Sequence, residues 1–145
     1  MKPVNEIKMT FPSRSVNERY ARVAVAAFAA QLDPTLDEIN DIKTVISEAV
    51  TNSIVHAYPD SIGDILILAR IYPNGIFEMT ITDKGIGIED IERARQPMFT
   101  TGGDDRSGMG FTIMESFTDK LTVHKRRGGG TIVKMKKQFS PRLSG

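Results

Sequence analysis

Two strand-like segments joined by a short turn constrain the fold of this chain most strongly. The residues from Ile65 to Tyr72 form a nearly continuous apolar run, and those from Phe77 to Thr82 alternate strictly between apolar and polar. Between them stands Pro73-Asn74-Gly75, a combination typical of hairpin turns. We therefore expect an antiparallel hairpin with one buried face at the centre of the chain.

Asp83 directly follows the second of these segments. It has the same parity as Phe77 and Ile81, so its side chain starts toward the covered face, where a carboxylate needs a partner. Gly85 and Gly87 come next, and glycine lets the backbone take positive φ and lets a ligand approach without meeting a Cβ. Such a carboxylate could accept a hydrogen bond from an exocyclic amine such as that of adenine. Taken alone, the stretch is better explained as an acidic turn.

The first part of the chain predicts a strand and a helix. Alternating apolar residues from Ile7 to Phe11 indicate a half-buried strand that Pro12 ends. Ser15 and Glu18 have capping-box spacing and predict a helix that runs to about Gln31. Alanine-rich helices suit close packing in a core or at a subunit interface, and the core is the expectation here. The positions expected to face it are Val16, Tyr20, Val23, Ala27 and Ala30.

A second, longer helix is predicted between Thr35-Glu38 and Tyr58-Pro59. The first pair has capping-box spacing, and the residue before a proline avoids helical geometry. Glu48, Asn52 and His56 stack at i, i+4 and i+8, close to the apolar face. The positions expected in the core are Ile39, Ile42, Ile46, Ala49, Val50 and Ile54.

The region after Asp83 predicts a binding loop. Residues 89–95 can form a short helix, and residues 96–110 lack periodicity, as lids and binding loops commonly do. Met109, Ile113 and Phe117 then mark a helix that begins at Gly108-Met109-Gly110. Glycines at a helix amino end expose N–H groups that suit a phosphate.

A last hairpin completes the pattern, with strands at residues 121–125 and 131–139 around the turn at residues 126–130. The order of strand, two helices, two strands, lid, helix and two strands predicts an α+β two-layer sandwich. We expect a mixed, mainly antiparallel sheet with helices on one face. Residues 1–139 would form a single domain, with residues 140–145 as a flexible tail.

Composition limits the classes of function. The chain has 145 residues, of which 40% are hydrophobic and 26% charged, as in a soluble single domain. Its net charge of +1 and lack of long basic blocks argue against direct nucleic-acid binding. Cysteine is absent, which excludes disulfides. No apolar run could span a bilayer and no signal-peptide pattern begins the chain, so we expect a cytoplasmic protein without membrane contact.

Three short motifs occur in a meaningful order. They are Glu48-x-x-x-Asn52 on a helix, Asp83-x-Gly85-x-Gly87 after a strand, and Gly108-x-Gly110 before a helix. This set resembles the N, G1 and G2 boxes of the GHKL ATPase superfamily, whose members bind ATP in the Bergerat fold. Residues 47–52 and 56–58 look like the anti-sigma serine kinases of this superfamily. Residues 96–101 and 106–115, with residues 21–23 and 31–35, are similar to the sporulation anti-sigma F family among them. The similarity covers about residues 5 to 137.

The resemblance implies a role for each matching residue. Asn52 would coordinate Mg²⁺ through its amide oxygen, and Glu48 would take the proton from an attacking serine hydroxyl. Arg106 would stabilise charge on the γ-phosphate. Asp83 would accept from the adenine amine. The full set of implied cofactor-binding residues is Asn52, Asp83, Gly85, Gly87, Thr101, Ser107, Gly108, Gly110 and Thr131.

The resemblance also implies partners. The protein would bind a sigma factor and phosphorylate an anti-anti-sigma factor, using Glu18 and Arg22 on the first helix as partner contacts. A homodimer is expected, because the first strand is a candidate edge followed by an alanine-rich helix. Two alternatives stay open: a general-stress anti-sigma kinase of the same architecture, and a non-catalytic module in which ATP only shapes the sigma-binding surface. A detached histidine-kinase ATPase domain is not favoured, because no helical phosphoacceptor domain precedes the motifs.

Overall fold

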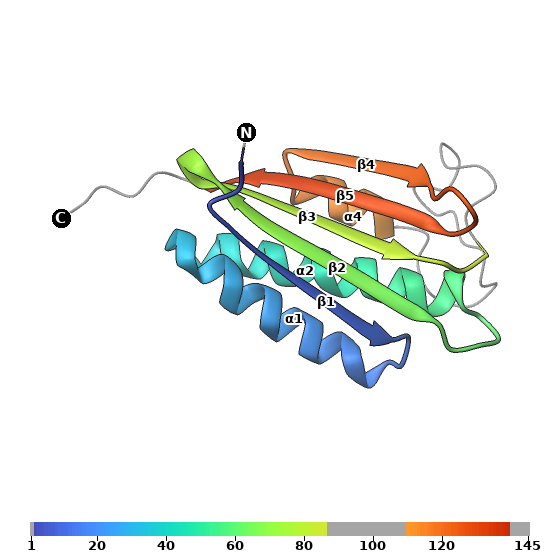
Figure 1. Ribbon diagram of the computed structural model, residues 1–145. Coiled ribbons are helices and arrows are strands. Elements are labelled where there is room, and N and C mark those ends of the chain that lie inside the picture. Colours follow the sequence, from blue (N-terminus) through green and yellow to red (C-terminus); the bar gives the residue numbers. More distant parts are fainter. Residues whose placement is uncertain (1, 87–109, 140–145) are drawn as a thin grey trace.

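Two layers make up the part of the chain that this computed structural model describes, residues 2–86 and 110–139 (Figure 1). One layer is a five-stranded sheet in the order β1-β2-β3-β5-β4, and helices cover one of its faces. The predicted two-layer sandwich is confirmed. Every pair among the described strands is antiparallel, so this part of the sheet is not mixed as predicted. The strands are β1 (Asn5–Pro12), β2 (Asp64–Tyr72), β3 (Ile76–Asp83), β4 (Lys120–Lys125) and β5 (Thr131–Gln138).

The predicted central hairpin is confirmed. β2 and β3 pair in a register that sets Asp83 opposite Ile65, and β5 sets Thr131 on the other side of Asp83. The turn uses positive φ at Asn74 (68°) and Gly75 (77°), as a tight hairpin connection requires. The parity prediction for Asp83 also holds, since its side chain is buried on the helix-covered face.

Helix α1 (Val16–Ala29) differs from the sequence prediction in how it starts. Ser15 has helical angles, φ −60° and ψ −30°, and its side chain makes no capping hydrogen bond. The capping box predicted there is therefore wrong. The helix continues as a 3₁₀ turn, Ala30–Leu32, and ends at Asp33, which has a positive φ of 51°.

The face of α1 predicted to be buried is the exposed one. Val16, Tyr20 and Val23 are 63%, 68% and 59% exposed. The buried residues are instead Ala21, Val25, Ala26, Phe28 and Ala29. Alanine occurs around most of this helix, so two of its sides are apolar, and the side with Phe28 and Val25 fills the core. The larger apolar residues of the other side remain in solvent.

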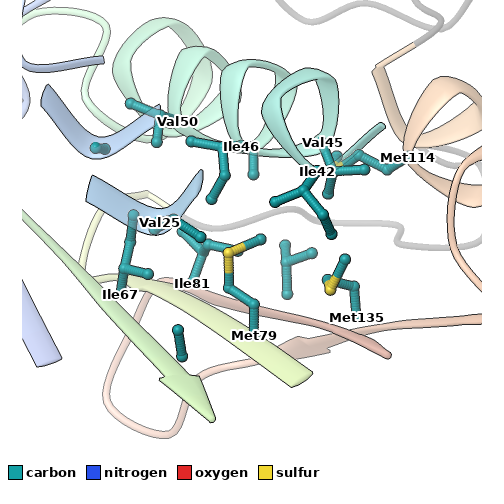
Figure 2. Packing of buried hydrophobic residues seen from close by; sticks show 14 of the residues in the cluster. Val25, Ile42, Val45, Ile46, Val50, Ile67, Met79, Ile81, Met114 and Met135 are labelled. Atoms are coloured by element: carbon teal, nitrogen blue, oxygen red, sulfur yellow. The ribbon is translucent and has the colours of Figure 1, made fainter. Parts of the chain in front are cut away.

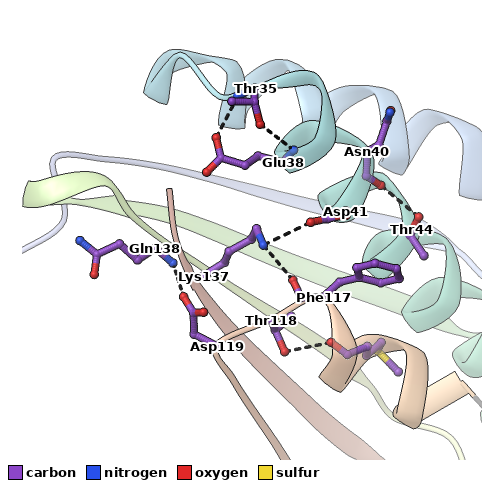
Figure 3. A network of polar contacts seen from close by, with 11 residues as sticks. Thr35, Glu38, Asn40, Asp41, Thr44, Phe117, Thr118, Asp119, Lys137 and Gln138 are labelled. Atoms are coloured by element: carbon purple, nitrogen blue, oxygen red, sulfur yellow. Dashed lines mark hydrogen bonds and ion pairs between the residues drawn. The ribbon is translucent and has the colours of Figure 1, made fainter. Parts of the chain in front are cut away.

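Helix α2 (Leu36–Asn52) confirms its predicted capping box. The N–H of Glu38 donates to Thr35 Oγ1 at 3.1 Å, and the N–H of Thr35 donates to Glu38 Oε1 at 2.9 Å (Figure 3). Its buried residues are Ile42, Val45, Ile46, Ala49 and Val50, whereas Ile39 and Ile54, predicted in the core, are only half-buried at its edge. Figure 2 shows this face packed over Ile67, Met79 and Ile81 of the sheet.

Helix α4 (Gly110–Ser116) packs on the same side of the sheet beside α2. It buries Phe111 and Met114, whereas Ile113 and Phe117, the residues that marked this helix in the sequence, are half-buried. Lys137 ties the layers together, with its Nζ 3.4 Å from the Asp41 carboxylate and 3.2 Å from the carbonyl of Phe117 (Figure 3). Among the described helices, none is long and apolar enough to cross a membrane.

Candidate functional site

Asp83 is the most buried charged group of the candidate site, with 6% of its surface exposed. Its Oδ1 accepts hydrogen bonds from the backbone N–H groups of Gly85 (3.0 Å) and Thr131 (3.2 Å). Its Oδ2 accepts one from Ser53 Oγ at 3.4 Å. Burial raises the pKa of Asp83, while these hydrogen bonds and the charge of Arg126 act in the opposite direction. The carboxylate is therefore fixed in orientation, with Oδ1 more fully bonded than Oδ2.

A π-helical turn, Ser53–Ala57, extends α2 and forms one wall of this site. The N–H of Tyr58 donates to the carbonyl of Ser53 at 3.2 Å, a spacing of five residues. Such wide turns occur mostly inside helices and often at functional sites. Here the turn sets the Ser53 hydroxyl against Asp83, while the Ala57 carbonyl accepts from the N–H of Ile86 at 3.0 Å.

Gly85 is required by a close approach of the backbone and not by the positive φ that was expected. It is not among the described glycines with positive φ, and a Cβ on it would collide with the carbonyl oxygen of Ala57. Its missing side chain therefore lets the turn after β3 pack against the π-helical turn. Gly130 serves the other flank, where a φ of 102° and a close approach to the Asp83 carbonyl both exclude a side chain.

Glu48 and Asn52, one helical turn apart near the end of α2, face the start of α4. A Cβ built on Gly110 would lie 3.5 Å from Glu48 Oε2 and 3.6 Å from Asn52 Oδ1, which is ordinary contact distance. Asn52 precedes Ser53, whose hydroxyl contacts Asp83, so both halves of the site meet at this point of the chain. His56, the third residue of the predicted i, i+4, i+8 series, lies in the π-helical turn and not in α2 itself.

Among the described residues, Asn52 offers an amide oxygen that could hold a metal ion. The described residues contain no group of three or more histidine, cysteine, aspartate or glutamate side chains arranged to hold a metal. Mg²⁺ prefers oxygen donors and commonly takes only one or two from the protein, the rest coming from water and substrate phosphates. An amide oxygen such as Asn52 Oδ1 beside a helix start fits that mode of binding.

A groove of about 560 Å³ lies between α1 and α2. Its lining includes Arg19 and Arg22 from α1, and Lys43 and Glu48 from α2. Arg22 Nε stands 3.7 Å from Glu18 Oε1 in an i, i+4 pair whose side chains are 36% and 17% exposed. Arg22 and Glu48, predicted separately for partner binding and for chemistry, thus border one surface depression.

The structure brings most of the predicted site residues that it describes into two adjoining clusters. Five predicted residues lie outside the described ranges: Gly87, Thr101, Arg106, Ser107 and Gly108. Thr131 lies opposite Asp83 in the strand register, and its backbone N–H donates to the carboxylate. Sequence reasoning missed Ser53 and Tyr58, because nothing in a linear pattern marks a π-helical turn. It also missed Gly130, whose close neighbour is the Asp83 carbonyl of another strand.

Comparison with known proteins gives the class of the domain. Residues 11–137 match the family described as histidine kinase-like ATPase domain. The fold is similar to the RsbU and RsbW domains of Rv1364c from Mycobacterium tuberculosis, with a TM-score of 0.68 and 18% identity over 94% of this chain and 32% of that one. It is also similar to the mycobacterial sensor histidine kinase MprB, with a TM-score of 0.58 and 14% identity over 94% of this chain and all of that one. Fold and match together define a histidine kinase-like ATPase domain.

Curated relatives identify the family within this class of ATPase domains. The chain is 52% identical to the anti-sigma F factor of Geobacillus kaustophilus (strain HTA426) over 137 residues, covering 94% of each chain. It is 54% identical to the anti-sigma F factor of Clostridium beijerinckii over 138 residues, covering 94% of this chain and 96% of the relative. This chain belongs to the anti-sigma F factor family, which confirms the resemblance drawn from the motifs.

Proposed function

We propose that this protein is a Mg-ATP-dependent serine kinase that binds and inhibits a sporulation RNA polymerase sigma factor and phosphorylates the anti-anti-sigma antagonist of that factor. The observation that carries the proposal is the junction at Asn52-Ser53. There a buried carboxylate, Asp83, adjoins the helix turn that presents Glu48 and Asn52 to the start of α4. Membership of a family of anti-sigma factors with an ATPase domain supports the same conclusion.

Asp83 is proposed to recognise adenine. Among the described residues, its Oδ2 receives one hydrogen bond, from Ser53 at 3.4 Å, and a carboxylate oxygen has two lone pairs. The 6-amino group of adenine would donate to this oxygen. Gly85 and Thr131 hold Oδ1 through their N–H groups, so the remaining acceptor keeps a fixed direction. We assign Gly87 to the same turn.

The triphosphate would lie between the end of α2 and the start of α4. Asn52 is proposed as the protein ligand of Mg²⁺, through Oδ1. Backbone N–H groups of Gly108 and Gly110 would face the phosphates. Thr101, Arg106 and Ser107 are assigned to the same group by their place in the family motif, with Arg106 opposing charge on the γ-phosphate.

Glu48 is the proposed general base. Bound Mg-ATP supplies the γ-phosphoryl group and an electrophilic phosphorus. As the serine oxygen of the antagonist forms its bond to that phosphorus, the bond to the β,γ-bridging oxygen breaks and ADP leaves. Glu48 accepts the hydroxyl proton. A non-catalytic, ATP-gated module would need Asn52 but would have no use for a base at position 48.

The outer face of α1 is the proposed partner surface. Val16, Tyr20 and Val23 are exposed apolar residues, and Arg22 lines the same groove as Val23. Arginine next to aromatic and aliphatic side chains is typical of interface hot spots. We propose that sigma and the antagonist both contact Glu18 and Arg22, which would make their binding mutually exclusive.

We further propose a cytoplasmic homodimer whose subunits each form one domain from residue 1 to 139. Among the described strands, β1 is at the edge of the sheet and pairs only with β2, so one side of its backbone could pair with a second copy. Its neighbour α1 exposes apolar side chains, and a two-fold axis near both would cover two copies of the same surface.

Phosphoryl transfer tests the proposal directly. The protein is incubated with γ-labelled Mg-ATP and candidate anti-anti-sigma proteins, and the label is then examined for acid stability. Acid-stable label on a serine of the antagonist is expected. Sigma binding without transfer to any antagonist would favour the non-catalytic module, and transfer only to the antagonist of a general-stress sigma factor would favour the related kinase. The names of the curated relatives support the sporulation reading.

A further inference from the structure

The hydroxyl group of Tyr58 bridges two loops at the base-binding side of the site. It accepts a hydrogen bond from the backbone N–H of Lys84 at 2.7 Å and donates one to the carbonyl of Asp64 at 2.8 Å. Lys84 follows Asp83 directly, and Asp64 begins β2. The side chain is buried, with 8% of the residue exposed. One phenol group therefore fixes the turn after β3 to the start of the neighbouring strand.

The ring of Tyr58 packs closely against Gly63. Gly63 lies against the ring so closely that a Cβ there would overlap three of its carbon atoms. Gly63 is itself held by Ser13, which exchanges hydrogen bonds with it: Gly63 N–H donates to Ser13 Oγ at 3.0 Å, and Ser13 N–H donates to the Gly63 carbonyl at 2.8 Å. Ser13 is buried. The position of the hydroxyl is thus set by contacts from two other segments.

Three consecutive N–H groups of the turn after β3 have separate acceptors. Lys84 donates to Tyr58, Gly85 donates to Asp83 Oδ1, and Ile86 donates to the Ala57 carbonyl. Two of these acceptors belong to neighbouring residues at the end of the π-helical turn. The N–H of Gly85 donates to the Asp83 carboxylate. A rotation of the backbone at Lys84 would therefore move the Gly85 N–H, which helps to orient that carboxylate.

We propose that Tyr58 is a positioning residue for adenine recognition: by holding the Lys84 N–H it fixes the turn that points Asp83 Oδ2 at the base. This inference rests on the proposed adenine site. Burial raises the pKa of the Tyr58 phenol, so the group keeps the proton that it donates to Asp64 at neutral pH. Tyr58 would determine how strongly the site prefers a purine with a 6-amino group over one without it. It would not affect binding of the phosphates.

Tyr58→Phe keeps the ring packed against Gly63 and removes only the hydroxyl group. The affinities of ATP and of purine riboside triphosphate, which lacks the 6-amino group, are measured by titration calorimetry with Mg²⁺. We expect ATP to bind about five- to tenfold more weakly, in line with the loss of one buried hydrogen bond, and the analogue to change less than about twofold. Tyr72→Phe is the matched control, since its hydroxyl bonds Glu78 at 3.4 Å on the uncovered sheet face, and it should change neither affinity.

The outcomes separate this role from a structural one. An equal loss for ATP and for the analogue would mean that Tyr58 only stabilises the fold, and unchanged ATP affinity would remove the role altogether. Asp83→Asn is run beside it. If that variant also keeps the wild-type ratio of the two affinities, the adenine site itself is wrong. If Asp83→Asn lowers the ratio of ATP affinity to analogue affinity while Tyr58→Phe keeps the wild-type ratio, only the role of Tyr58 is wrong.

Amide hydrogen exchange gives a second measurement that does not depend on the variant folding. In the wild-type protein the Lys84 N–H should be protected, and its NMR signal should shift on addition of ATP but much less with the analogue. Fast exchange at Lys84, or equal shifts with both nucleotides, would contradict the proposal.

Discussion

Replacing Asp83 by asparagine changes one acceptor into a donor while leaving the local network satisfied. The amide Oδ1 can still accept from the N–H groups of Gly85 and Thr131. The amide nitrogen then takes the place of Oδ2 and can donate to Ser53 Oγ, because a hydroxyl group both donates and accepts. The variant should therefore fold, but it presents a donor to the adenine amine.

The size of the effect follows from the kind of hydrogen bond that is lost. A bond to a charged group in a buried site contributes about 1.5–3 kcal/mol. ATP affinity should therefore fall by roughly 10- to 150-fold. Titration calorimetry at fixed Mg²⁺ measures this, with circular dichroism as a check on folding. A folded Asp83→Asn protein with wild-type ATP affinity would refute the assignment of Asp83 to the base pocket.

The same variant tests the electrostatic argument without nucleotide. The folded protein raises the pKa of Asp83, so between the ordinary and the raised value the folded state holds a proton that the unfolded state has released. The contribution of this group to stability therefore falls as the pH rises through that interval. Denaturant unfolding of both proteins from about pH 4 upward should show the wild type gaining stability relative to Asp83→Asn on acidification. A constant difference would show that burial does not penalise this carboxylate.

Three further experiments test other parts of the proposal. Glu48→Gln should reduce phosphoryl transfer by roughly 10²–10⁴-fold while ATP binding survives, and near-normal transfer would exclude Glu48 as the base. Arg22→Ala should weaken binding of sigma and antagonist by about 2 kcal/mol, roughly thirtyfold, in surface plasmon resonance. Arg70→Ala is its control, because both arginine side chains are 36% exposed and ion-paired, but Arg70 bonds Glu6 on the other side of the sheet. Sedimentation at tens of micromolar should give the mass of two chains, and a single-chain mass would remove the homodimer.

Features with a local physical cause could be predicted from the sequence. An apolar run, a turn motif and an alternating segment predicted the β2–β3 hairpin. The alternation in β3 also predicted the inward direction of Asp83, since side-chain parity follows from the pleat. The Thr35–Glu38 capping box was also predictable, because both of its hydrogen bonds span only three residues.

Features that depend on packing could not be predicted. α1 has two apolar sides, and the choice between them depends on how closely its alanines approach α2, which no pattern within the helix records. The π-helical turn at Ser53–Ala57 changes which atoms face Asp83 without leaving a sequence signal. Gly85 was explained by ligand approach, whereas its neighbour in space is the Ala57 carbonyl, 28 positions earlier in the chain.

The correction on α1 strengthens the link between partner binding and catalysis. With Val16, Tyr20 and Val23 in solvent, Arg22 stands at the border of an exposed apolar surface, and it also lines the groove that reaches Glu48. An antagonist seated on Arg22 would lie next to the proposed base, so binding there would bring its serine toward Glu48. Sigma seated on the same residue would occupy that approach without offering an acceptor serine. Exclusion of one partner by the other and control of the chemistry would then follow from a single shared surface, without a change in the fold.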